Sequence, residues 1–146
     1  MRDEFERALS EAAARFCVEC GKCTATCPMA EMYPAFSWDL SPRGIVQQAL
    51  RGEELLKSQA LWCCTECRAC TRTCPAGVDC SGLVTRLRPL ARLETGSPEA
   101  GKCACGCELP PRPVLDYLRS VLPRAELHYL TLCPACRRQA YFRNNS

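Results

Sequence analysis

Apolar residues recur at intervals of three and four along the first part of the chain, the spacing that places them on one face of an α-helix. In residues 1–16 these positions are Phe5, Leu9, Ala12, Ala13 and Phe16. Asp3 and Glu4 stand where acidic side chains favour a helix N-terminus. The pattern predicts an amphipathic helix over residues 1–16.

A second helix is predicted to begin after Ser41, an N-cap residue followed by Pro42 at the first helical position. Its apolar face consists of Ile45, Val46, Ala49 and Leu50. Gly52 stands where this helix is expected to end, because glycine is common just after helix C-termini.

Two more helices follow from the same spacing. One covers residues 53–62, with one face made by Leu55, Leu56, Gln59 and Trp62. The other begins after the cap residue Ser81 and buries Leu83, Val84, Leu87 and Leu90. Pro89 is expected to kink this last helix or limit its length. Strand-like alternation is missing from these segments, so the fold class is predicted to be mainly α.

The composition changes near Gly96. Residues 94–113 are rich in glycine, proline, serine and charged side chains, as in a linker or loop. We therefore divide the chain into a helical domain, residues 1–95, and a linker with a small cysteine-rich, zinc-ribbon-like module, residues 96–146. Within the module we predict a helix at 113–122, a short strand at 127–132 and a turn at 133–136.

One cysteine motif, C-x2-C-x2-C-x3-C-P, occurs twice in the helical domain. The first copy is Cys17, Cys20, Cys23, Cys27 and Pro28; the second is Cys64, Cys67, Cys70, Cys74 and Pro75. A single copy could be a zinc knuckle, but two copies with identical spacing, each followed by proline, favour iron–sulfur clusters. We predict two [4Fe-4S] clusters.

Three cysteines of each run can wrap three corners of a cubane, and the fourth corner needs a ligand from elsewhere. In two-cluster ferredoxins the last cysteine of each motif ligates the other cluster. This pattern predicts crossed ligand sets: Cys17, Cys20 and Cys23 with Cys74, and Cys64, Cys67 and Cys70 with Cys27. Cys63 and Cys80 lie outside the motifs and are interpreted as packed thiols.

The chain holds 15 cysteines in 146 residues and shows no signal peptide or membrane-spanning segment. We expect a cytoplasmic protein, where clustered cysteines bind metal more often than they form disulfides. The formal charge of +3 would fall to about −1 with two clusters of roughly −2 each. Nucleic-acid binding therefore has no electrostatic support.

A third metal site is predicted in the tail. Its cysteine pairs, Cys-x-Cys and Cys-x2-Cys, suit a tetrahedral Zn²⁺. The favoured ligands are Cys103, Cys105, Cys133 and Cys136, with Cys107 as a substitute. A third iron–sulfur cluster and a tail without metal are the alternatives. His128, the only histidine, is expected to pack or to bond at the surface.

Several features together resemble HdrC, the small iron–sulfur component of heterodisulfide reductase, over residues 5–93. They are the motif pair, the segment Ser41-Pro42-Arg43 between the copies, Trp62 before the second copy, and the stretch Cys74-Pro75-Ala76-Gly77-Val78-Asp79. The resemblance implies an α-helical ferredoxin fold and a non-catalytic subunit that passes single electrons. It implies as partners a flavin-containing HdrA-like protein and a catalytic HdrB-like protein in a hetero-oligomer.

The sequence leaves two other functions open. The chain could be a free-standing ferredoxin that diffuses between enzymes, or a redox sensor whose clusters act as switches. A glycine-rich dinucleotide fingerprint, a phosphate-binding P-loop and a CCG motif are all missing from the sequence, so a catalytic site of its own is not expected.

Overall fold

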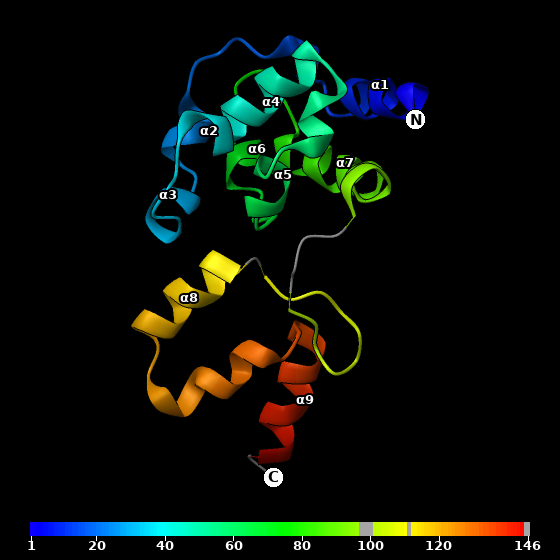
Figure 1. The fold of residues 1–146 in the computed structure, drawn as a ribbon. Coiled ribbons are helices and arrows are strands. Elements are labelled where there is room, and N and C mark those ends of the chain that lie inside the picture. The colour runs from blue at the N-terminus through cyan, green and yellow to red at the C-terminus, as the bar shows by residue number, and fades with distance from the viewer. Residues whose placement is uncertain (97–100, 111, 145–146) are drawn as a thin grey trace. The chain divides into compact units, whose positions relative to one another are not determined.

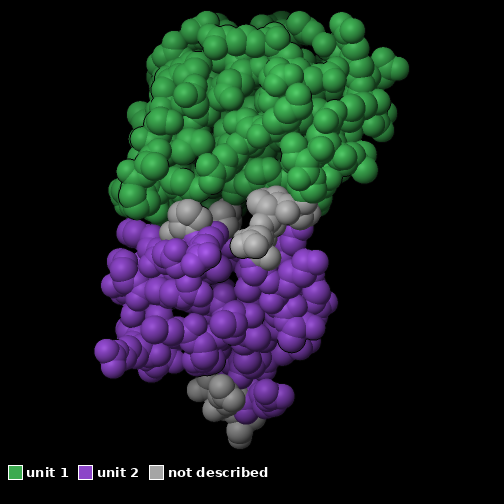
Figure 2. Space-filling model, viewed as in Figure 1, with its two compact units in different colours: residues 1–98 green, residues 99–146 purple. Residues whose placement is uncertain are grey.

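The computed structural model describes residues 1–96, 101–110 and 112–144 (Figure 1). The chain forms two compact units, residues 1–98 and 99–146, which Figure 2 shows in green and purple. Within the described ranges every regular element is a helix, and the only extended pairing is an isolated bridge between Lys102 and Glu108. The predicted mainly α fold is confirmed. Positions 97–100 and 111 of the predicted linker lie outside the described residues.

The described part of unit 1, residues 1–96, contains seven α-helices and three short 3-10 helices. In chain order they are α1 (Arg2–Glu11), η1 (Ala14–Phe16), α2 (Lys22–Ala25), α3 (Met29–Met32), η2 (Trp38–Leu40), α4 (Pro42–Arg51), η3 (Glu53–Lys57), α5 (Ala60–Cys63), α6 (Ala69–Thr73) and α7 (Cys80–Thr95). The core lies where α1, α4 and η3 pack against α7. Its largest fully buried side chains include Phe5, Leu9, Ile45, Leu55, Leu56, Leu61, Leu83 and Leu87.

The first helix is shorter than its sequence pattern predicts. Helix α1 ends at Glu11, and Ala13 takes a left-handed backbone with φ 52°. The carbonyl of Ala12 accepts a hydrogen bond from the backbone of Asp79 (2.9 Å), which draws the chain off the helix axis. Phe5 and Leu9 are buried as predicted, but Phe16 is 71% exposed beside the first cysteine motif.

The second predicted helix is confirmed as α4. The Ser41 hydroxyl accepts a hydrogen bond from the backbone N–H of Gly44 (3.0 Å), and Pro42 occupies the first helical position. Gly52 ends the helix with φ 138°, in a backbone region that favours glycine. Helix α4 is thereby fixed at both ends, beside the loop that follows the first motif.

The continuous helix predicted at residues 53–62 is wrong. The segment forms η3 and then α5, because Ser58 between them has an extended backbone (ψ 139°). The Ser58 hydroxyl accepts a hydrogen bond from the N–H of Ala60 and restarts the helix (3.2 Å). Leu55, Leu56 and Leu61 still reach the core.

Helix α7 begins at a different cap from the one predicted. Asp79, rather than Ser81, accepts the hydrogen bond from the backbone N–H of Gly82 (2.9 Å). Pro89 does not end this helix, which continues to Thr95. Pro89 has no N–H, so the carbonyl of Thr85 loses its helical hydrogen-bond donor. Both residues lie on the exposed face of the helix, where water can donate to that carbonyl instead.

Unit 2 contains α8 (Arg112–Val121), η4 (Arg124–Thr131) and α9 (Pro134–Asn144). The strand predicted at 127–132 is wrong, since these residues belong largely to the 3-10 helix η4. The turn predicted at 133–136 is instead the first turn of α9, because Pro134 fits the first helical position. The described part of unit 2 buries few apolar side chains besides cysteines: Val114, Leu115 and Leu130.

Candidate metal centres

The two cysteine motifs fold into loops with matching backbones. Glu19 and Glu66, two residues after the first cysteine of each motif, have φ of 53° and 56°. Gly21 and Arg68, at the next equivalent positions, have φ of 76° and 62°. A left-handed backbone costs a residue other than glycine about 1–2 kcal/mol, so the surrounding structure must hold these loops in place. The short helices α2 and α6 follow and pack against each other.

A threonine fastens each loop to the helix behind it. Thr24 donates a hydrogen bond to the Ser41 hydroxyl, the cap of α4 (3.2 Å). Thr71, at the equivalent place in the second motif, donates to the Asp79 carboxylate, the cap of α7 (2.9 Å). Each cap side chain therefore joins a cysteine loop to a helix N-terminus.

An arginine from the following helix fastens the glutamate of each loop. Arg43 of α4 pairs with Glu19 (2.8 Å), and Arg88 of α7 pairs with Glu66. Arg88 also donates to the backbone carbonyls of Leu61 (2.9 Å) and Cys64. These ion pairs contact the left-handed residues directly, and so help to hold the loop conformations.

The first loop encloses a recess of about 410 Å³, open solvent included. The cysteines that line it are Cys17, Cys20, Cys23, Cys70, Cys74 and Cys80. Val18, Val46 and Val78 supply apolar surface, and Arg43 is the basic residue of the wall. The recess offers soft sulfur ligands in apolar surroundings, which suits an iron–sulfur cluster.

The second loop encloses a recess of the same volume. Its cysteines are Cys27, Cys64, Cys67, Cys70 and Cys80. Met29, Leu40 and Ile45 supply the apolar surface, and Arg68 is the basic residue here. In donor chemistry the second recess matches the first, but Glu19 lies beside Arg43 in the first wall and none of the described residues of the second wall is acidic.

The last cysteine of each motif lines the recess of the other motif. Cys74 lies in the wall of the first recess, and Cys27 lies in the wall of the second. Cys70 and Cys80 line both recesses, so the two share a common wall. Five motif cysteines therefore line the first recess and four line the second, with Cys70 counted in both.

Hydrogen bonding and burial set the pKa values of the wall thiols. A hydrogen bond from Cys80 lowers the pKa of Cys70, and the same contact raises the pKa of Cys80. Burial raises the pKa of Cys64 to about 11. Cys20 and Cys67, in contrast, are exposed to solvent, one in each recess. Each recess therefore has one cysteine at the surface and a buried inner wall.

Two residues outside the motifs have the surroundings that were predicted from the sequence. Cys63 is buried away from both recesses, and its thiol donates to the carbonyl of Gln59 (3.3 Å). His128 is exposed, with its Nδ1 2.8 Å from the carbonyl of Ala125. Cys80 is buried as predicted, but its place in the shared wall was not foreseen.

A third group of cysteines lies in unit 2. The sulfur atoms of Cys103, Cys105, Cys133 and Cys136 all lie within 4.8 Å of one another. No other three cysteine, histidine or acidic side chains form so compact a group in the residues that the structure describes. Backbone hydrogen bonds from Cys105 and Cys136 lower the pKa values of Cys103 and Cys133, respectively.

Residues 13–78 match the family model of the 4Fe-4S dicluster domain, a range that contains both recess-forming loops. The matched part of the chain is a 4Fe-4S ferredoxin-like region. No curated protein gives a significant match. This 4Fe-4S domain supports an iron–sulfur electron-transfer protein, and the matched region ends before the cysteines of unit 2. The third group therefore needs an account of its own.

Reading the two copies of the motif side by side would have identified further residues of the ferredoxin-like site. Glu19 and Glu66 match in the two copies, and so do Thr24 and Thr71. Both pairs turn out to hold the loops. No helix in the described ranges is long and apolar enough to cross a membrane.

Proposed function

We propose that unit 1 binds two [4Fe-4S] clusters with crossed ligand sets and relays single electrons between them. Cys17, Cys20, Cys23 and Cys74 would hold one cluster, and Cys27, Cys64, Cys67 and Cys70 the other. The observation that carries the proposal is the exchange of Cys27 and Cys74 between the two recesses. When bound, such clusters supply reversible one-electron oxidation and reduction.

The shared wall supports a relay. Cys70 and Cys80 separate the recesses, so an electron passing between them crosses little more than two side chains. The Cys80 thiol is fixed there by its contact with the carbonyl of Pro42 (3.5 Å). Exposed Cys20 and Cys67 offer two surface points, one for each recess, where a donor and an acceptor can approach.

The basic residue in the wall of the second recess favours reduction of a cluster there. A cluster on four thiolates carries roughly −2, and each added electron makes it more negative. Arg68 lines the second recess, where its positive charge offsets part of this cost, whereas Arg43 in the first recess pairs with Glu19 of the same wall. The apolar side chains of both walls limit the access of water to the bound clusters.

At the level of the complex, we propose that the chain acts as an HdrC-like component of a heterodisulfide-reductase-like assembly. It would accept electrons from a flavin-containing HdrA-like protein and deliver them to a catalytic HdrB-like protein in the cytoplasm. The support is the resemblance of residues 5–93, together with two exposed cysteines that suit two different partners. A free-standing ferredoxin would share these clusters but needs no permanent partner.

An EPR-monitored reductive titration of the anaerobically purified full chain tests the relay. Because the recesses share a wall, the spectrum of the fully reduced protein should be split or broadened by interaction between two spins. A single unsplit signal that integrates to one spin would contradict two adjacent clusters.

Anaerobic purification from the source cells tests the complex. We expect the chain to elute in one stoichiometric assembly with a flavoprotein and a protein that reduces disulfides. Elution as a monomer that exchanges electrons with several unrelated enzymes would favour the free-standing ferredoxin.

A further inference from the structure

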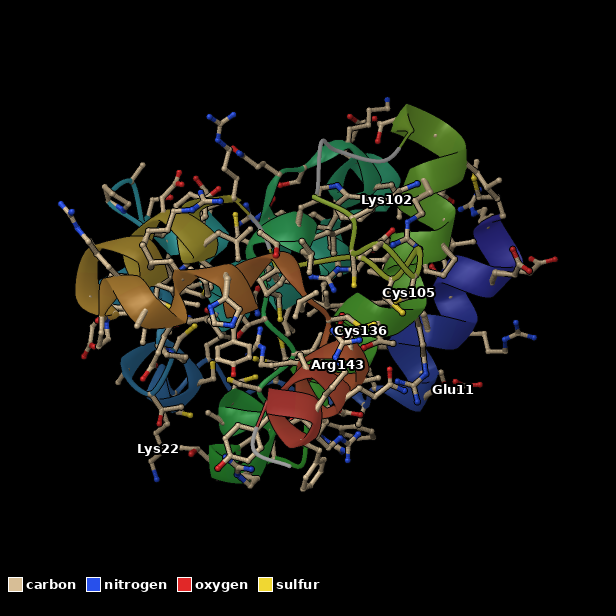
Figure 3. All side chains as sticks on the ribbon, turned by 90° about the horizontal axis from the view of Figure 1, so that it is seen from below. Glu11, Lys22, Lys102, Cys105, Cys136 and Arg143 are labelled. Carbon is tan, nitrogen blue, oxygen red and sulfur yellow. The ribbon has the colours of Figure 1, made fainter. Side chains whose placement is uncertain are left out.

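The cysteine group of unit 2 is compact enough to surround one ion. The sulfur atoms of Cys103, Cys105, Cys133 and Cys136 lie within 4.8 Å of one another, and those of Cys105 and Cys133 are 3.5 Å apart. All four are free cysteines in the structure. Figure 3 labels Cys105 and Cys136, which come from the loop of residues 101–109 and from the start of α9.

Backbone hydrogen bonds shape the loop that supplies the first two sulfurs. The N–H of Cys103 donates to the carbonyl of Cys107 (2.9 Å), and the N–H of Leu109 donates to that of Gly101 (2.9 Å). Gly106 has φ 88° and closes the turn, where a side chain would be strained. The loop is therefore a tight knuckle that turns Cys103 and Cys105 toward one point.

The start of a helix supplies the other two sulfurs. Cys133 immediately precedes α9, and its carbonyl accepts a hydrogen bond from the N–H of Arg137 (2.8 Å). Cys136 lies within the first helical turn, so its sulfur stands next to that of Cys133. A knuckle facing a helix start is a frequent way to build a four-cysteine metal site.

The spacing of the sulfurs distinguishes a single ion from a cubane. Four thiolates that each lie about 2.3 Å from one zinc stand about 3.8 Å apart. In a [4Fe-4S] cluster each cysteine binds a different iron, so the sulfurs surround the whole cubane and stand further apart. A group confined within 4.8 Å fits the single ion and is too small for a cubane.

The small apolar core of unit 2 indicates that such an ion would stabilise the fold of this unit. Apart from cysteines, its described part buries few apolar residues, namely Val114, Leu115 and Leu130. Cys103 and Cys133 are themselves only 3% and 2% exposed, so two of the four ligands are buried, while Cys105 lies at the surface and Cys136 is half-buried. A unit of this size commonly needs a metal or disulfides to remain folded.

We propose that unit 2 holds one Zn²⁺ on Cys103, Cys105, Cys133 and Cys136, as a structural site separate from the electron relay. Four thiolates close the coordination sphere and leave no position for a substrate. Cys107 lies outside the compact group of four, although its thiol contacts those of Cys105 and Cys133, and we assign it no ligand role. This site would take no part in the electron relay, because zinc neither gains nor loses electrons in proteins.

Metal analysis of the full chain and its variants tests this site. Wild type should contain one zinc per chain, and zinc K-edge X-ray absorption should show four sulfur neighbours at about 2.3 Å. Cys136→Ser, at a half-exposed ligand, should lower the zinc content at least tenfold while the iron content and the EPR spectrum stay unchanged. Cys107→Ser is the matched control and should retain both metals.

Three results would overturn the zinc site. The first is nitrogen or oxygen neighbours in the absorption spectrum of the wild type. The second is equal zinc loss in Cys107→Ser and Cys136→Ser. The third is wild type without zinc that contains iron beyond the amount held in unit 1, which would mean an iron site in this group. If Cys136→Ser does not fold, the zinc absorption spectrum of the wild type still tests the site. This spectrum would be the same if the proposed electron relay of unit 1 were wrong, so the two proposals can fail separately.

Discussion

The two units use cysteine in contrasting ways. In unit 1 the motif cysteines are spread around two recesses, and long side chains from α4 and α7 hold the loops behind them. In unit 2 four sulfurs come within 4.8 Å of one another, held by a tight knuckle and one helix start. The residue type is the same in both, so in our proposal the backbone decides whether cysteines surround a cluster or a single ion.

The two units also differ in what keeps them folded. Unit 1 buries a large group of leucines and other apolar side chains between α1, α4, η3 and α7. Apart from its cysteines, unit 2 has few such residues in its described part. We therefore expect unit 1 to depend on core packing as well as on its clusters, and unit 2 to depend chiefly on its metal.

The largest expected effect comes from serine substitution of Cys74 and Cys27, which we propose are exchanged between the two clusters. Cys74→Ser and Cys17→Ser should lose the same cluster, because both sulfurs line the first recess. Cys27→Ser and Cys64→Ser should lose the other cluster and leave a complementary EPR spectrum. Each variant should keep about half of the iron and all of the zinc.

The experiment is decided by which variants share the same EPR spectrum. If Cys74→Ser resembles Cys64→Ser rather than Cys17→Ser, the ligands are not exchanged. Cys63→Ser is a suitable control, because Cys63 lies near the second motif but outside both recesses.

Core truncation should distinguish the two units next. Leu83→Ala removes a fully buried side chain of α7 and should destabilise unit 1 by about 2–5 kcal/mol. Thermal unfolding of the anaerobic protein measures the change. The zinc content should stay constant, since unit 2 is a separate compact unit. Loss of zinc from this variant would show that the two units depend on each other.

Sequence periodicity predicted the helices whose caps and apolar faces agree. Ser41, Pro42 and Gly52 mark α4 at both ends, and the structure follows them. The periodicity failed at Ser58, where a local hydrogen bond interrupts the helix. The start of α7 was also predicted wrongly, because Asp79 and Ser81 are both possible N-cap residues. The strand expected at 127–132 failed because a short apolar run fits a 3-10 helix equally well.

The candidate ligands were easier to predict than the residues that support them. Cysteine spacing alone suggested the compact group of unit 2, whose four sulfurs the structure brings together. The position of Cys80 in a shared wall depends on how α7 packs, which no local pattern contains. The pairing of Glu66 with Arg88 joins residues 22 positions apart and is likewise a product of the fold.

A smaller effect is expected from Arg88→Gln. This change removes a positive charge that contacts the carbonyl of Cys64 and pairs with Glu66. The potential of the cluster in the second recess should fall by on the order of tens of millivolts, because reduction adds negative charge there. A redox titration followed by EPR measures the shift.

Arg86→Gln is the control for this prediction. Arg86 also lies on α7, but it pairs with Glu11 and Asp79 rather than with the second loop. An equal fall in both variants would show a general charge effect instead of a local one.

The smallest effect is expected from Thr71→Val, which removes the hydrogen bond between the second loop and the cap of α7. A hydrogen bond to a charged group is worth about 1.5–3 kcal/mol when buried, and this partly exposed one should contribute about 1 kcal/mol. Thr24→Val, the matching change in the first loop, should cost less because its partner Ser41 is neutral. Chemical denaturation under anaerobic conditions compares the two, and a greater loss in Thr24→Val would contradict this ranking.

The direct test of two clusters in unit 1 and one ion in unit 2 is a count of metals and acid-labile sulfide in the anaerobic full chain. We predict about eight irons and eight sulfides with one zinc per chain. About four irons would mean a single cluster in unit 1. About twelve irons without zinc would place a third cubane in unit 2. Either result would contradict the division of chemistry between the two units.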